Sequence, residues 1–346
     1  LFCQGNVDPI YASAQMVFEA CAAFFGLEKR DAERRLRSAE NAINPPRGGT
    51  VSPAACKHRV ESDVRRRVIM SSGTLAMRKG TLARKLAEQA RANKAGEYRR
   101  WIHTRDMPGS GVKTRLFCEK APADEVHLMS EAEHAVFLEA WWRSDVVAIL
   151  EQYALNRDKT QRAAAELNID HPTYRRTGEP AVLSTDLVLL VQSGNSYHRE
   201  VLSVKGGWPR GIRPLTRSQE IERRTWENEG ARYKAVAVYG MHADRSKNLA
   251  WIFRAANDML GRDLSEAELT AQRALYQLVR RCPSMSVMEA CREVDRSLAI
   301  PAGSGVRAFR QLAATKRIRF DLDTVDPLGI RLADVRASTT GMSRNR

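Results

Sequence analysis

The sequence has no apolar run long enough to cross a membrane. A membrane-spanning helix needs about 18 or more consecutive apolar residues, and the longest apolar stretches here, such as residues 188–191, have the length of a strand. Segment 14–25 is fairly apolar, but Glu19 interrupts it and no basic region precedes it. This pattern argues against a signal peptide, and we expect no membrane partner.

Cysteine motifs are also missing. The chain has six cysteines in 346 residues and no C-x-x-C pair. Scattered cysteines of this kind form neither a disulfide framework nor a zinc site. They are typical of a protein that works in a reducing cytosol.

Acidic residues are outnumbered by basic ones. The sequence has 41 Asp and Glu against 56 Lys and Arg, which gives a net charge of +15 and a pI near 9.9. Such an excess favours a polyanionic partner, above all a nucleic acid, over a merely soluble basic protein. The length and the 43% apolar content allow two or three domains, each with its own core.

Core-forming periodicity is scarce before residue 77. A polar helical pattern over 28–42 is broken by the Pro- and Gly-rich stretch 44–49, and the first residue is Leu. From Met77 onward, apolar residues recur at helical spacing. We therefore expect residues 1–76 to be a disordered extension or non-native coding sequence, with Met77 or Met70 as the start. The alternative is an accessory helical segment.

Helices and strands alternate between residues 112 and 239, which predicts an α/β fold. A run of helices follows from residue 250 to 315, and a short strand at 318–322 suggests a winged-helix module. We expect a disordered tail at 338–346. The expected strands are 112–118, 145–153, 181–192, 197–205 and 234–239, and the expected helices are 130–142, 160–167, 217–229, 250–260, 265–282, 286–298 and 306–315.

Three ionisable residues stand out in this pattern. Glu133 lies in the first turn of a helix, Asp186 in an apolar strand, and Lys205 in the next strand. Because strand side chains alternate in direction, a hairpin can bring Asp186 and Lys205 within the width of one metal site. Phosphodiester hydrolysis needs carboxylates that hold a divalent ion and a cation beside the attacking water. The order of these residues therefore indicates a metal-dependent nuclease.

Each of these residues also has a structural explanation. Ser130 and Glu133 form a capping-box pattern, in which the glutamate returns a hydrogen bond to the Ser130 amide. Asp186 could end a strand or pair with Lys205 in a buried salt bridge. Taken singly, the patterns favour these structural roles.

Residues 94–240 resemble the TnsA family, the endonuclease subunit of heteromeric Tn-seven-like transposons. Similarity continues more weakly through residues 291–295 and 318–320, and residues 1–76 lie outside it. The resemblance is carried, in order, by residues 98–101, Pro108-Gly109-Ser110-Gly111, 127–133, 149–155, His171-Pro172, 184–186, 204–205 and 220–226.

That resemblance implies a restriction-enzyme-like PD-(D/E)XK nuclease over residues 77–244 and a winged-helix-like domain over 245–337. It implies Glu133 and Asp186 as ligands of Mg²⁺, for which Mn²⁺ would substitute, and Lys205 as the catalytic lysine. Glu222 matches a further acid of the family, although an ordinary helical salt bridge would explain it too.

The family also implies partners and a place of action. Its members nick the 5′ ends of transposon DNA, a TnsB-like transposase cuts and joins the 3′ ends, and a TnsC-like ATPase links both to the target. We therefore expect a bacterial cytoplasmic protein at the nucleoid. The basic residues of the last module could contact DNA, bind the ATPase or be solvated; they are Arg307, Arg310, Lys316, Arg317 and Arg319.

One position departs from the family pattern. The family usually has a glutamine two residues before the lysine, where this chain has Ser203. A serine hydroxyl is a shorter and weaker ligand for a hard cation, although water can bridge the gap. Two alternatives to an active transposon nuclease therefore stay open: a catalytically weakened assembly subunit, and a stand-alone restriction or repair nuclease.

Overall fold

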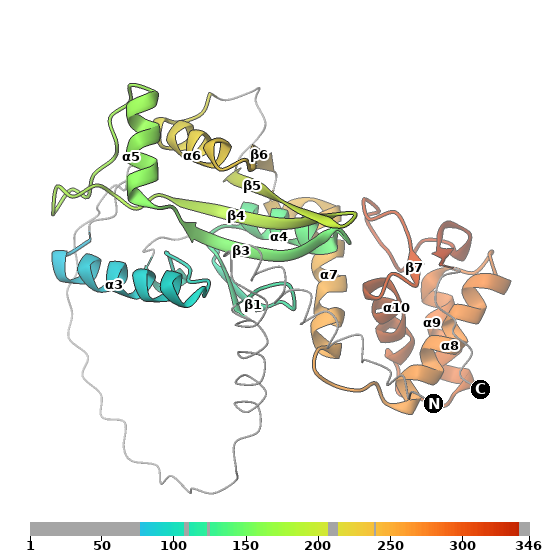
Figure 1. Cartoon of the computed structure of the whole chain (residues 1–346). Helices are drawn as coiled ribbons and strands as arrows, with labels where there is room; N and C mark the ends of the chain where they lie inside the picture. The colour runs from blue at the N-terminus through green and yellow to red at the C-terminus, as the bar shows by residue number, and fades with distance from the viewer. Residues whose placement is uncertain (1–76, 107–110, 123–124, 207–213, 239, 339–346) are drawn as a thin grey trace, which may run out of the picture.

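The computed structural model describes residues 77–106, 111–122, 125–206, 214–238 and 240–338 (Figure 1). The predicted extension at 1–76 lies outside these residues, as does the tail predicted at 338–346 except for Ser338, whose amide donates to the Arg317 carbonyl. No helix in the described ranges is long and apolar enough to cross a membrane.

A four-stranded mixed sheet forms the centre of the first part of the chain, and it confirms the predicted α/β class. The strands lie in the order β3 (Val146–Ala154), β4 (Ser184–Ser193), β5 (Ser196–Gly206) and β6 (Arg232–Val238). Strand β4 is antiparallel to both β3 and β5, and β6 is parallel to β5. Residues 187–191 of β4 form a continuous apolar run because both faces of the sheet are covered there.

Helix α4 (Glu131–Trp142) covers one face of the sheet, and α5 (Arg157–Glu166) and α6 (Arg217–Asn228) lie on the other (Figure 1). Alternation along β4 divides its apolar side chains between two cores. Leu187, Leu189 and Val191 pack in the core of α4. Val188 and Leu190 pack in the core that includes α6.

Two smaller units precede the sheet. Helix α3 (Lys79–Ala95) appears where the periodicity from Met77 predicts a helix, and its Leu82 packs with Trp101 in a small core. A short helix η1 (Thr104–Asp106) leads to a hairpin of β1 (Thr114–Phe117) and β2 (Glu125–Leu128). Strand β2 was not expected, because four residues give too short a period-two pattern.

The second part of the chain contains the expected helices, α7 (Asp244–Met259), α8 (Glu266–Arg281), α9 (Val287–Ser297) and α10 (Ser304–Ala314). Short helices η2 (Gly240–His242) and η3 (Leu332–Asp334) accompany them. The predicted strand at 318–322 is shorter than expected: β7 (Ile318–Arg319) has two residues and pairs with β8 (Arg336–Ala337).

Helix α7 joins the two parts of the chain through a shared core. Phe253 packs edge-on against Phe137 and Trp141 of α4, with ring centroids 5.8 and 4.8 Å apart. Lys316 Nζ, which follows α10, donates to the Trp142 carbonyl at 2.7 Å and so caps the end of α4. The C-terminal helices are therefore attached to the helix that begins at the candidate site.

The segment 291–295, which carries part of the weaker resemblance, packs α9 against α10. A Cβ atom on Gly305 would lie 2.3 Å from the Cys291 carbonyl oxygen, so only glycine allows this close approach. The Asp295 carboxylate accepts from the amides of Gly303 and Gly305, at 2.8 and 2.7 Å, and caps the first turn of α10.

Replacing Gly305 by Ala should therefore destabilise the protein. Overpacking against a backbone carbonyl costs about 1–3 kcal/mol, and thermal unfolding followed by circular dichroism would measure it. Gly80→Ala is the matched control, because Gly80 is also helical and has open space around it. The control should leave stability unchanged or raise it slightly. Equal effects of the two substitutions would contradict the close packing of α9 and α10.

Candidate active site

Strands β4 and β5 separate at Asp186. Their backbone pairing runs from Ser193 and Ser196 down to Leu187 and Leu202 and continues no further toward Asp186. There the Asp186 Oδ2 atom accepts the Val204 amide at 2.6 Å. The carboxylate thus takes the place of a backbone acceptor and is fixed between the diverging strands.

The alternation of side chains also breaks at this point. Leu187 packs on the α4 side of the sheet. Thr185, two residues earlier, lies on the α6 side, where it donates to Glu222 at 2.7 Å and accepts from Trp226 Nε1 at 2.8 Å. On neighbouring β3, Gln152 has a left-handed φ of 50°. This local irregularity lets acids from helices on opposite faces meet at Asp186.

Glu133 approaches from the N-terminus of α4 and is only 7% exposed. Its amide donates to Ser130 Oγ at 3.1 Å, as a capping box predicts. Its carboxylate, however, accepts from the Met129 amide at 2.9 Å and from Gln152 Nε2 at 3.2 Å, instead of from the expected Ser130 amide. Capping and a position in the site are therefore compatible.

Glu222 approaches from α6 on the opposite face and is 6% exposed. Besides Thr185, its carboxylate accepts from the Tyr233 hydroxyl at 3.4 Å. Lys205 is exposed at the end of β5. Its positive charge acts on both Asp186 and Glu222 and opposes the rise of their pKa values. The structure thus brings together Glu133, Asp186, Glu222 and Lys205, all expected from the sequence.

Burial raises the pKa values of all three carboxyls in this site. Burial, and then repulsion by Asp186, raise the pKa of Glu133 to about 7 and that of Glu222 to about 8. Burial also raises the pKa of Asp186, against the opposing effect of Lys205. Crowded carboxyls of this kind are relieved by a cation.

The donors present fit a magnesium ion. Among the described residues, no group of three or more His, Cys, Asp or Glu is placed to enclose a metal. Mg²⁺ does not need such a cage, because it keeps several waters and takes one or two carboxylates together with a substrate phosphate. Glu133 and Asp186 could supply those two carboxylates.

Ser203 lies in the site but is already hydrogen-bonded. It is 2% exposed, accepts from Gln219 Nε2 at 3.2 Å and is also linked to Tyr233. Gln219 is held in turn, since its Oε1 atom accepts from the Thr216 amide at 3.0 Å. The Ser203 hydroxyl therefore belongs to a buried polar network that extends to Glu222.

Two glutamines of the site were not singled out from the sequence. Gln219 reads as an ordinary capping-box residue of α6. Gln152 has a stronger signal, because Glu151 and Gln152 are consecutive polar residues in a strand that is otherwise buried and apolar. Both are buried and hydrogen-bond to site residues.

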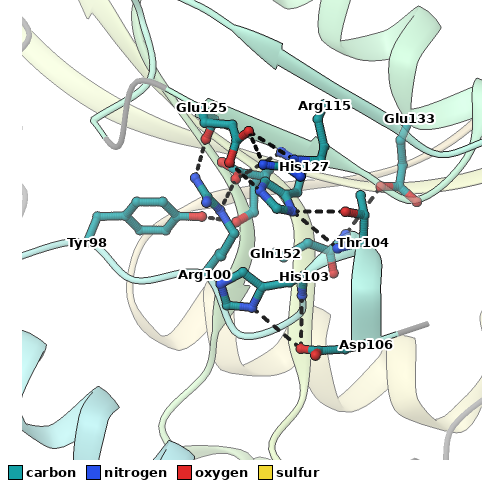
Figure 2. A network of polar contacts seen from close by, with 11 residues as sticks. Tyr98, Arg100, His103, Thr104, Asp106, Arg115, Glu125, His127, Glu133 and Gln152 are labelled. Carbon is teal, nitrogen blue, oxygen red and sulfur yellow. Dashed lines mark hydrogen bonds and ion pairs between the residues drawn. The ribbon is translucent and has the colours of Figure 1, made fainter. Parts of the chain in front are cut away.

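A second polar network adjoins the site (Figure 2). The Glu151 carboxylate is fully buried and accepts from Arg100 Nε at 2.5 Å and from the His127 amide at 3.2 Å. His127 Nε2 is 2.9 Å from Glu125 Oε2. Trp101 is 2% exposed. Segment 98–101, which carries part of the family resemblance, thus has Arg100 and Trp101 engaged inside the protein.

The basic residues of the last module divide in a similar way. Arg310 donates to the Trp251 carbonyl at 2.8 Å and lies over the Trp251 ring, and Lys316 caps α4. Arg317 lies over the ring of Tyr276. Arg307 and Arg319 are exposed and therefore accessible to a partner.

The site predicts a stability that depends on pH. A carboxyl whose pKa is raised on folding favours the folded state while it holds its proton, and this stability is lost as the pH rises. For Glu222 the loss spans roughly pH 4.5 to 8, at up to about 1.4 kcal/mol per pH unit. Glu222→Gln should therefore be more stable than wild type at pH 8, with a smaller difference at pH 5.

Thermal unfolding in EDTA at the two pH values would measure this effect. Glu227→Gln is the control, since Glu227 lies on the same helix, exposed and paired with Arg223. Its substitution should change stability equally at both pH values. A Glu222→Gln variant that is no more stable than wild type at pH 8 would show that Glu222 is ionised at little cost.

Comparison with known proteins finds similarity to one family. The family model described as TnsA endonuclease C terminal matches residues 242–322. Transposon Tn7 transposition protein TnsA of Escherichia coli is 25% identical over 242 residues, which cover 70% of this chain and 85% of the relative. The two matches support the assignment of this chain to the TnsA family.

Proposed function

We propose that this chain is a Mg²⁺-dependent DNA endonuclease that nicks the 5′ ends of a transposon during cut-and-paste transposition. The observation that carries the proposal is the meeting of Glu133, Asp186 and Lys205 at the opening between β4 and β5. Membership of the TnsA family, whose C-terminal model is named for an endonuclease, supports a role in transposition.

The proposed chemistry follows from the groups in the site. A bound Mg²⁺ supplies Lewis-acid stabilisation of the phosphate and lowers the pKa of a water. Glu133 and Asp186 would hold the ion. Lys205, exposed at the end of its strand, would orient the water and stabilise the transition-state charge. Cleavage would leave a 3′-hydroxyl and a 5′-phosphate.

The fold supports two finer proposals. The mixed sheet with helices on both faces suits a restriction-enzyme-like PD-(D/E)XK core. Helices α8 to α10 with the β7–β8 pair suit a winged-helix-like module. In that module Arg307 and Arg319 are available to DNA or to a TnsC-like ATPase, while a TnsB-like transposase would act on the other strand.

One observation favours a second candidate function. The Ser203 hydroxyl is buried and engaged by Gln219 and Tyr233, so it has little freedom to serve as a ligand. On that basis the chain would be a weakened nuclease that acts mainly as an assembly subunit of the transposition complex.

Replacing Asp186 or Lys205 by Ala should abolish nicking of supercoiled transposon-end DNA in Mg²⁺ or Mn²⁺. Each change removes a group on which the ion or the transition-state charge depends, so the rate should fall by about 10²-fold or more. Lys159→Ala is the control, because Lys159 is an exposed lysine of α5 paired with Glu229. Full activity of both site variants would sink the assignment, whereas an inactive wild type would favour the assembly subunit.

Substitutions at Ser203 of β5 and at its hydrogen-bond partner Gln219 of α6 test the role of Ser203. Ser203→Gln alone should keep or raise cleavage, because it restores a longer oxygen ligand near the ion. Since Gln219 lies against Ser203, the double variant Ser203→Gln with Gln219→Ser makes room for the new side chain. If both variants fold by circular dichroism and lose nicking severely, the metal site is organised differently.

A further inference from the structure

We propose that Gln152 is a third protein ligand of the cation, with a side chain that serves the site in two ways. Its amide nitrogen would hold the two acids together in the absence of an ion, and its amide oxygen would bind the ion when one enters. This inference rests on the proposed function, because it presupposes a cation held by Glu133 and Asp186.

The first step of the argument is the position of the Gln152 side chain. It is 3% exposed, and its Nε2 atom donates to Glu133 Oε2 at 3.2 Å (Figure 2). The same amide also lies near enough to Asp186 to oppose the rise in the pKa of that carboxyl. Gln152 thus lies beside both acids, which come from a helix and from a neighbouring strand.

The backbone conformation of Gln152 is the second step. A left-handed φ of 50° is unfavourable for a residue with a side chain, and the adjoining chain holds it in place. The Trp101 amide donates to the Gln152 carbonyl at 2.9 Å, and the Tyr98 hydroxyl donates to the Glu151 carbonyl. Arg100 anchors the Glu151 side chain at 2.5 Å. Residues 98–101 therefore aim Gln152 at the acids.

The chemistry of a carboxamide supplies the third step. One end has two N–H donors and the other has an oxygen with two lone pairs. A donor end suits two carboxylates that face each other without a cation, whereas Mg²⁺ and Mn²⁺ prefer oxygen ligands. Rotation about the last side-chain bond exchanges the two ends without moving the backbone. Glutamine can thus fill both roles, which neither leucine nor glutamate can.

Gln152→Gly and Gln152→Glu separate this role from a structural one. Glycine suits a left-handed φ, so the first variant removes the amide and relieves the backbone. Its affinity for Mn²⁺, measured by calorimetry on the full chain, should fall by about tenfold or more. Gln152→Glu keeps an oxygen ligand and should bind Mn²⁺ at least as tightly as wild type. In EDTA it should unfold at a lower temperature, because a further carboxylate joins the cluster.

Asn168→Gly is the matched control. Asn168 also has a left-handed φ, of 52°, but it is exposed after α5. This variant should bind Mn²⁺ like wild type. The inference about Gln152 would be overturned, and the proposed function left standing, by either of two results. One is a Gln152→Gly variant whose Mn²⁺ affinity is within about twofold of wild type, and the other is a Gln152→Glu variant that binds Mn²⁺ as weakly as Gln152→Gly. If Asp186→Asn binds Mn²⁺ like wild type, the cation site itself is wrong and the proposed function falls with the inference.

Discussion

The structure of the site depends on one hydrogen bond, in which a side-chain carboxylate replaces a backbone carbonyl as the acceptor of a strand amide. Where β4 and β5 part, the Asp186 carboxylate accepts the Val204 amide in place of a backbone carbonyl. A buried amide must find an acceptor, so the end of the ladder and the position of Asp186 are fixed together. Side chains from α4, β3 and α6 then converge on the opening that this creates.

Much of the fold follows from sequence patterns, whereas the details of the site do not. The long apolar strands and the capped helices are found within a few residues of their predicted bounds, because burial and capping are local signals. Glu133, Asp186 and Lys205 do come together, although their chemical roles remain predictions. The polar pair Glu151 and Gln152 marks β3 as unusual, but the left-handed conformation of Gln152 is held by a long-range contact with the Trp101 amide, which no local pattern encodes.

Internal contacts of basic side chains explain why the net charge of the chain overestimates the number of cations that are free to meet DNA. Arg100, Arg310 and Lys316 are bound to a carboxylate or to backbone carbonyls within the protein. Composition counts them with the exposed cations Arg105, Arg307 and Arg319. Net charge therefore indicates a kind of partner, while packing decides which residues remain to meet it.

Helix α4 has a mechanical consequence. Its first turn carries Glu133, and its last turn is held by Lys120 and Lys316 and packs against Phe253 of α7. A helix of 12 residues is a stiff rod about 18 Å long. The acid at one end of this rod and the attachment of the C-terminal helices at the other are therefore parts of one rigid element.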